Sequence, residues 1–163
     1  MKELVAREIA GMVKDGDIIG VGTGTTVDLA LSAIHERVRS EGLRLTVVPS
    51  SMHSAWQCQE IGLTVMYPGY RGELSWGFDG ADEVDERLIL IKGKGGALLQ
   101  EKILAARCKT FYAIVDESKV VARLGAACPI PVEVIPEAVY LAEKGLRALG
   151  ADQVVVRPCT GGK

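Results

Sequence analysis

Apolar positions in the N-terminal third of the chain follow a helical period and then form a strand-like run. One set recurs at helical spacing: Leu4, Val5, Ile9, Met12 and Val13. These side chains share one face of a predicted helix, which Asp15-Gly16 ends. The apolar run 18–21 follows and is typical of a buried strand. A polar loop over 23–26 then leads into a second amphipathic helix over 27–39, which ends near Gly42.

The alternation of strand and helix continues as far as residue 115. We expect strands over 45–48, 63–66, 76–78, 88–91 and 111–115, and helices over 54–61 and 97–106. Strands separated by helices are typical of a parallel sheet that is covered on both faces. The predicted fold class is therefore α/β, with a Rossmann-like, doubly wound and mostly parallel sheet.

The pattern changes after Cys128. Residues 129–136 contain three prolines and are interpreted as a linker passing into an edge strand, because proline cannot donate to a strand ladder. A helix over 137–149 and a strand over 154–156 are expected next. The sequence thus predicts an α/β domain over 1–128 and the start of a smaller α+β lobe over 129–163. Too few elements follow residue 129 to close a core, so we expect a C-terminally truncated chain.

Composition and charge narrow the class of protein. The 163 residues are 48% hydrophobic and 25% charged, which is ordinary for a globular protein. The net charge is −2 and the basic residues are scattered, so no footprint for nucleic acid or for an anionic membrane appears. The apolar runs are far shorter than the ~20 residues that a membrane span needs. We expect no nucleic-acid partner, no membrane partner and a small-molecule ligand.

The four cysteines show no Cys-x-x-Cys spacing, which argues against a zinc site. Reduced thiols of this kind are typical of cytoplasmic proteins. Lys2, Glu3 and Arg7 interrupt any secretory signal early. Neither histidine spacing nor a calcium-loop pattern supports another metal. We therefore expect a cytoplasmic protein without a metal site.

The segment GVGTGTT at 20–26 joins a predicted strand to a predicted helix. Its glycines, its hydroxyl groups and the helix N-terminus are groups that bind phosphate. The segment lacks the Gly-Lys-Ser/Thr of a P-loop and the spacing of a dinucleotide fingerprint. The alternative is a tight turn in which Thr25 or Thr26 caps the helix. Lys2 could add a countercharge or simply be solvated.

Two carboxylates follow the apolar run 76–78. Asp79 and Asp82 lie three residues apart in a turn with Gly80 and Ala81. Both carboxylates could face one cleft, where they would accept hydrogen bonds from sugar hydroxyl groups. The alternative is a solvated acidic turn.

A lysine and a glutamate flank the glycine-rich turn that follows the apolar run 88–91. The ammonium group of Lys92 should emerge at a strand end, and the glycines after it would let a ligand approach the backbone. Glu101 lies about one turn into the next helix, whose N-terminal end favours an ionised carboxylate that could act as a base. The alternative is a surface glutamate, and Lys94 is assigned provisionally to the solvated face. Lys119, just past another strand, could add a second cation.

Taken together, these segments resemble the type A ribose-5-phosphate isomerase family. The matching pieces keep the family's order and spacing: GVGTGTT at 20–26, FDGADEVD at 78–85, IKGKGGALLQEK at 91–102, DESK at 116–119 and PIPVEVIP at 129–136. A match in several parts is more specific than one glycine loop. The resemblance covers essentially the whole chain, although the family normally continues well past residue 163.

The resemblance implies the interconversion of ribose 5-phosphate and ribulose 5-phosphate through an enediol, with neither a metal nor another cofactor. Glu101 would shuttle a proton between C1 and C2. Asp79 and Asp82 would contact sugar oxygens and assist ring opening, and Lys92 would stabilise the developing oxyanion with the 93–95 backbone. The expected substrate-binding residues, chiefly around the phosphate, are Thr23, Gly24, Thr25, Thr26, Gly80, Ala81, Gly93, Lys94, Gly95, Lys119 and Lys2.

The chain departs from the family in two places. Lys94 stands where many members have glycine, and the segment 50–56 departs from the serine-rich pattern expected after the second strand. The implied partners are a pentose phosphate and further copies of the chain, in a homo-oligomer that is a dimer or a tetramer. The alternatives are a non-catalytic sugar-phosphate sensor, which would need no base, and an inactive fragment. Glu101 together with Asp79, Asp82 and Lys92 favours the enzyme.

Overall fold

The computed structural model describes residues 2–66 and 69–157. Cys159 and the rest of the C-terminal segment 158–163 lie outside the described residues. The chain divides into two compact units, with the boundary between Pro131 and Val132.

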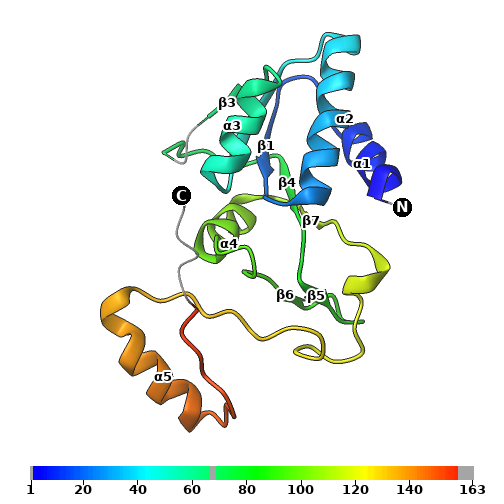
Figure 1. Cartoon of the computed structure of the whole chain (residues 1–163). Coiled ribbons are helices and arrows are strands. Elements are labelled where there is room, and N and C mark those ends of the chain that lie inside the picture. The colour runs from blue at the N-terminus through cyan, green and yellow to red at the C-terminus, as the bar shows by residue number, and fades with distance from the viewer. Residues whose placement is uncertain (1, 67–68, 158–163) are drawn as a thin grey trace. The chain divides into compact units, whose positions relative to one another are not determined.

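Five parallel strands form the central sheet of the first unit (Figure 1). They are β1 (Asp17–Val21), β2 (Leu45–Pro49), β3 (Thr64–Val65), β4 (Trp76–Asp79) and β7 (Phe111–Ala113). Their spatial order is β3-β2-β1-β4-β7, so the chain runs outward from β1 on one side and then returns to pair β4 with the other side of β1. This order confirms the predicted α/β class. In open sheets of this kind, ligands bind where the winding reverses, which here is at the carboxyl ends of β1 and β4.

Helices cover both faces of the sheet, as predicted. Helices α1 (Lys2–Gly11), α2 (Thr25–Glu41) and α3 (Met52–Glu60) contribute to the main core, whereas α4 (Leu98–Arg107) packs through Leu104 in a second cluster. The alternation of side chains along β1 explains the two cores. Ile19 and Val21 are 0% exposed in the main core, and the intervening strand positions face α4. The apolar period of each segment therefore determined which face it buries.

Two glycines bring α4 close to the sheet. A Cβ at Gly77 on β4 would lie 2.5 Å from Sγ of Cys108, and one at Gly20 on β1 would lie 3.0 Å from Cγ of Leu104. Side chains at these positions would push the helix off the strands. The first turn of α4, which carries Glu101, consequently lies at the carboxyl edge of the sheet, next to the end of β4.

The strand predicted over 88–91 is wrong in extent and in position. The observed strand β6 comprises only Leu90–Ile91 and pairs antiparallel with β5 (Glu83–Val84) in a separate two-stranded sheet. Leu88 is 81% exposed and has a φ of 61°. The carboxylate of Asp85 accepts hydrogen bonds from the N–H groups of Arg87 and Ile89 and thereby closes a turn. The first half of the apolar run, residues 88–89, thus belongs to a turn rather than to a buried strand.

In the second unit, the described helices cover residues 136–148. A short 3₁₀ helix (Pro136–Ala138) leads into α5 (Val139–Ala148), which confirms the predicted helix in that region. The edge strand predicted for 129–136 and the strand predicted for 154–156 are wrong, because neither segment is a strand in the described chain. A β-strand requires a neighbouring strand for its backbone N–H and C=O groups, and the described residues of this unit provide none. Within the described ranges, no helix is long and apolar enough to cross a membrane.

Candidate active site

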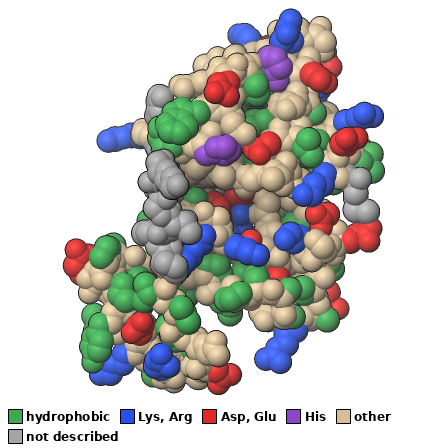
Figure 2. Space-filling view, viewed as in Figure 1, with side chains coloured by type: hydrophobic (Ala, Val, Ile, Leu, Met, Phe, Trp, Pro, Cys, Tyr) green, Lys and Arg blue, Asp and Glu red, His purple; other side chains and the backbone are tan. Residues whose placement is uncertain are grey.

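A cavity of about 300 Å³ lies at the carboxyl edge of the sheet, where the winding reverses. Figure 2 shows charged side chains of both signs gathered around a hollow on this face. Every predicted site residue except Lys94 lines the cavity: Glu101, Asp79, Asp82, Lys92, Lys2, Thr23, Gly24, Thr25, Thr26, Gly80, Ala81, Gly93, Gly95 and Lys119. The fold therefore brings together residues that are separated by more than a hundred positions in sequence.

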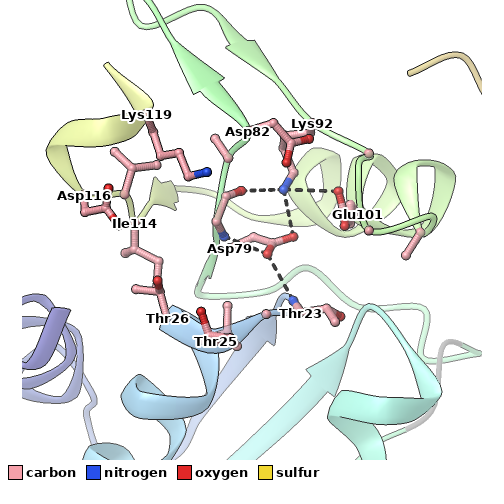
Figure 3. A pocket seen from close by; sticks show the side chains of 18 of the residues that line it. Thr23, Thr25, Thr26, Asp79, Asp82, Lys92, Glu101, Ile114, Asp116 and Lys119 are labelled. Atoms are coloured by element: carbon pink, nitrogen blue, oxygen red, sulfur yellow. Dashed lines mark hydrogen bonds and ion pairs between the residues drawn. The ribbon is translucent and has the colours of Figure 1, made fainter. Parts of the chain in front are cut away.

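Lys92 lies between two buried carboxylates on one side of the cavity (Figure 3). Its Nζ is 3.0 Å from Oδ2 of Asp79 and 3.2 Å from Oε2 of Glu101. It also donates a hydrogen bond to the carbonyl oxygen of Gly80. One ammonium group thus balances two carboxylates that would otherwise repel each other, and we call these three residues the Asp-Lys-Glu centre.

The backbone holds the other oxygen of Asp79. Its Oδ1 accepts a hydrogen bond from the N–H of Thr23 at 3.0 Å and from the N–H of Gly80 at 2.7 Å. The side chain is only 1% exposed, at the last position of β4. Both carboxylate oxygens are consequently fixed, one by backbone amides and one by Lys92.

Glu101 lies in the first turn of α4, and its side chain is almost fully buried. Burial raises the pKa of this carboxyl group; Lys92 opposes the shift and the negative charge of Asp79 adds to it, so that the pKa lies above the usual glutamate range. The helix N-terminus was expected to favour the ionised form, but the net shift of the pKa is upward and burial is its first cause. A carboxylate whose pKa is closer to neutrality is a stronger base for removing a proton from carbon.

Asp82 connects the two loops that form this side of the cavity. Its Oδ2 accepts a hydrogen bond from the backbone N–H of Lys94 at 2.9 Å, so the turn after β4 is tied to the loop after β6. The Lys94 residue is exposed and does not line the cavity. Lys94 therefore contributes its backbone N–H to this side of the site through Asp82.

The opposite end of the cavity has the groups of an anion site. The N-cap residue of α2 is Gly24, which provides no side-chain hydrogen bond, and Thr25 and Thr26 lie in the first turn. The alternative in which a threonine caps this helix is therefore wrong. Lys2 Nζ lies 3.4 Å from Oγ1 of Thr25, and Lys119 lines the same region. A helix N-terminus with two nearby cations favours a phosphate.

One charged residue of the cavity lining, Asp116, was not among the predicted site residues. Asp116 lines the cavity, and its Oδ2 is 3.9 Å from Nζ of Lys2. Hydrogen bonds from the side chain and backbone of Ser118 lower its pKa, and Lys2 and Lys119 add to that effect. Its position just past the strand Phe111–Ala113, three residues before the predicted cation Lys119, was the available signal.

Two further groups of polar residues lie behind the cavity and were also missed. Ser50, Ser51 and Ser54 surround the hydroxyl group of Thr23. Glu83 is 0% exposed and accepts hydrogen bonds from three backbone N–H groups in the segment 125–128. The serines follow the carboxyl end of β2, so their position at a strand end was the signal that could have identified them.

The described side chains offer no group of three or more His, Cys, Asp or Glu residues arranged to hold a metal ion. In the Asp-Lys-Glu centre, the positive charge between the carboxylates comes from the ammonium group of Lys92. The chemistry that this arrangement can perform is proton transfer by Glu101 next to a cation that can stabilise a developing oxyanion.

Comparisons with known proteins identify relatives of most of the chain. The family model described as ribose 5-phosphate isomerase A (phosphoriboisomerase A) matches residues 46–163. A curated relative of that name from Thermomicrobium roseum is 44% identical over 136 residues, which cover 83% of this chain and 57% of the relative. One from Methanocaldococcus jannaschii is 40% identical over 157 residues, which cover 95% of this chain and 69% of the relative.

Solved structures show the same relationship. The ribose 5-phosphate isomerase A structure from Methanocaldococcus jannaschii has a TM-score of 0.87 at 39% identity, covering 91% of this chain and 66% of that one. A D-ribose-5-phosphate isomerase in complex with phospho-erythronic acid has a TM-score of 0.85 at 34% identity, covering 90% of this chain and 65% of that one. The chain thus spans about two thirds of the length of these structures. With the family model matching most of its residues, the chain belongs to the ribose 5-phosphate isomerase A family.

Proposed function

We propose that this chain interconverts ribose 5-phosphate and ribulose 5-phosphate by proton transfer through an enediol. The observation that carries the proposal is the Asp-Lys-Glu centre, in which a buried glutamate with a raised pKa lies 3.2 Å from a lysine ammonium group. Membership of the family supports this reaction. The cavity at the reversal of winding supplies the space, and its anion end is suited to the phosphate.

In the proposed reaction, Asp79 and Asp82 contact sugar oxygens and assist opening of the ring. Glu101 then removes the proton from C2 of the open aldose, and the electron pair of that C–H bond forms the C1–C2 double bond. The charge moves to the oxygen on C1, where Lys92 and the backbone of 93–95 stabilise it. Glu101 returns its proton to C1, and the proton of the C2 hydroxyl group passes to the oxygen on C1 as the C2 carbonyl group forms, which completes the ketose. Electrons balance within the substrate, so the reaction needs no external oxidant or reductant.

At the anion end, we assign the phosphate to the N-terminus of α2, with Thr25 and Thr26, and to the side chains of Lys2 and Lys119. The macrodipole of α2 and the two ammonium groups act together on the same anion. Gly24, Gly80 and Ala81 line the same cavity. The sugar carbons would then extend from the phosphate toward Glu101.

The compound bound in one solved relative, phospho-erythronic acid, provides a probe for this arrangement. It carries a phosphate at one end and a carboxylate at the other, and a planar anionic carboxylate resembles the enediolate of the proposed reaction. We expect it to bind this chain with the phosphate at the anion end and the carboxylate near Lys92. As a stable analogue of the intermediate, it should bind more tightly than the substrate.

The test is the conversion of ribose 5-phosphate to ribulose 5-phosphate by this chain in the presence of EDTA, beside Glu101→Gln. Loss of a positioned base should lower kcat by about 10²–10⁴-fold, with binding of phospho-erythronic acid retained. A folded parent chain without turnover would contradict the proposal and favour the sensor or inactive-fragment alternative. Near-normal turnover by Glu101→Gln would remove Glu101 from the role of base.

We further propose that the protein acts as a homo-oligomer, either a dimer or a tetramer. Support comes from the second unit, where Tyr140 and Leu141 on α5 are 72% and 67% exposed. Sedimentation equilibrium measures the state directly, and a monomer at all accessible concentrations would contradict the proposal. The cytoplasmic location expected from the cysteine pattern stays a prediction.

A further inference from the structure

Four hydroxyl groups form a cluster behind the loop that follows β1. Oγ1 of Thr23 lies 2.7 Å from Oγ of Ser51, 2.9 Å from that of Ser54 and 3.1 Å from that of Ser50. Ser54 is 0% exposed, and none of the three serines lines the cavity. The cluster is therefore internal to the protein, and the proposed reaction gives the serines no role.

The directions of these hydrogen bonds follow from one carbonyl group. Oγ of Ser54 lies 2.7 Å from the carbonyl oxygen of Gly22, which can only accept, so Ser54 donates its proton there. Ser54 can then only accept from its hydroxyl neighbours, Thr23 at 2.9 Å and Ser51 at 3.1 Å, and the shorter contact assigns the hydroxyl group of Thr23 as the donor. The hydroxyl group of Thr23 in turn accepts hydrogen bonds from Ser50 and Ser51. With its one proton donated to Ser54, its donor and both of its lone pairs are then in use. The hydroxyl group of Thr23 is thereby satisfied inside the protein, and only its backbone N–H is directed at the site.

The chain of hydrogen bonds ends at Asp79. The carbonyl group of Gly22 and the N–H of Thr23 belong to one trans peptide unit, so they point to opposite sides. Ser54 holds the oxygen of this unit, and the nitrogen donates to Oδ1 of Asp79 at 3.0 Å. Hydrogen bonds linked in series polarise one another, so a donor on the oxygen strengthens the N–H as a donor.

The N–H of Gly22 holds the start of this loop through a hydrogen bond to the carbonyl oxygen of Phe78 at 2.8 Å, but that bond is made by the preceding peptide unit. Gly22 and Gly24 flank Thr23 in this loop. Gly24 has a φ of 130°, a conformation that glycine adopts readily. A glycine-rich segment can rotate its peptide planes at low cost. The hydroxyl group of Ser54 is the side-chain contact that holds the Gly22 carbonyl group in place.

We propose that Ser54 is a positioning residue for Asp79, acting through the Gly22–Thr23 peptide unit. Ser54 orients and polarises that unit so that the N–H of Thr23 donates to the carboxylate on the side opposite Lys92. The consequence for turnover rests on the proposed function, in which Asp79 contacts the sugar. The effect on the Thr23 amide does not depend on the proposed function, so the amide and the turnover can be tested separately.

The first measurement is the proton chemical shift of the residue 23 amide by NMR, because donation to a carboxylate moves an amide proton downfield. Asp79→Asn gives the reference position without the carboxylate charge. We expect Ser54→Ala to move the signal upfield toward that reference. Ser50→Ala, which removes one donor to Thr23 and leaves the Gly22 bond intact, is the matched control and should leave the signal nearly in place. Thr23→Val should fall between them, because it removes the donor to Ser54 but keeps the Gly22 bond.

The second measurement is turnover. Loss of one such hydrogen bond corresponds to about a tenfold fall in kcat for Ser54→Ala, with KM within about twofold, whereas Ser50→Ala stays within about twofold of the parent. An unshifted amide in folded Ser54→Ala overturns the proposal whatever the activity; if that variant does not fold, an unshifted amide in Thr23→Val does so. A shifted amide in a parent chain that lacks isomerase activity supports the positioning role and contradicts only the proposed function.

Discussion

Gly22 lies directly against the carboxyl group of Asp79: a Cβ built on Gly22 would be 2.0 Å from Cγ of Asp79. The contact joins the loop after β1 to the end of β4, across the point where the sheet reverses its winding. The loop that faces the phosphate end is thus packed against the side chain that contacts the sugar in the proposed reaction. A larger side chain at position 22 should therefore displace groups at both ends of the cavity.

Gly22→Ala should lower kcat/KM by about 10²-fold or more, because a displacement of a catalytic group by ~1 Å has an effect of that size. Steady-state kinetics and a thermal melt would measure it, and the melting temperature should fall as well. Gly11→Ala is the matched control, since a Cβ there meets no atom within 4 Å. Unchanged kinetics in Gly22→Ala would show that the contact with Asp79 is not needed for turnover.

Lys92→Met should raise the pKa of Glu101 further. The ammonium group lowers that pKa, while burial and the charge of Asp79 raise it, so removing Lys92 leaves only the raising effects. Carboxyl ¹³C NMR of Glu101 across a pH titration measures this without interference from the substrate phosphate. Lys102→Met, on the exposed face of the same helix, should leave the titration in place. A pKa that does not move would mean that Lys92 and Glu101 do not interact in solution.

The raised pKa of Glu101 also predicts how stability depends on pH. The folded state holds this proton more tightly than the unfolded chain, whose glutamates titrate near ~4.3. The protonated carboxyl group therefore stabilises the folded state fully below that pH. This stabilisation is lost as the pH rises through the pKa that Glu101 has in the folded state. Glu101→Gln should therefore melt no lower than the parent at pH 8, although it loses turnover. A clearly lower melting temperature would show that the ionised carboxylate stabilises the fold.

Thr26→Glu should weaken binding of phosphorylated ligands by more than about tenfold, because the new carboxylate would occupy the N-terminal end of α2 and repel the phosphate. An acidic residue in the first turn of a helix is itself favourable, so the variant should fold. Calorimetry with phospho-erythronic acid measures the loss, and the uncharged Thr26→Gln is the control. Equal affinities for the two variants would place the phosphate elsewhere.

Glu83→Gln should lower the melting temperature at neutral pH. Burial raises the pKa of Glu83, but hydrogen bonds from the N–H groups of Ala127, Gly125 and Cys128 outweigh it and hold the pKa below the usual range. The stabilisation is therefore full above the unfolded value of ~4.3 and is lost as the pH falls through the folded pKa.

Melts of the parent chain, Glu83→Gln and the exposed control Glu86→Gln would test this between pH 3 and 8. The difference in melting temperature between the parent chain and Glu83→Gln should become smaller toward pH 3, because the parent chain loses the same charge there. A deficit of the same size at every pH would point to packing rather than to the charged hydrogen bonds.

Periodicity was a sufficient guide where an element buries one regular face. Helix α2 and strand β1 were predicted close to their observed positions because the apolar spacing of each matches one face. The run 88–91 misled the prediction because its apolar residues are divided between a turn and a strand, which Asp85 determines through two backbone hydrogen bonds. The strand predicted over 154–156 failed for a related reason, since a ladder partner is a property of the fold and not of the segment.

The candidate site shows the same division. The sequence by itself determined the residue types and their places at strand ends, so that Asp79, Lys92 and Glu101 could be named together. Only the tertiary structure decided that Lys92 lies between the two carboxylates, that burial raises the pKa of Glu101 and that Ser54 reaches the Gly22 carbonyl group. Local spacing controls which face of an element a side chain occupies, whereas desolvation and contacts across the sheet depend on how distant segments pack.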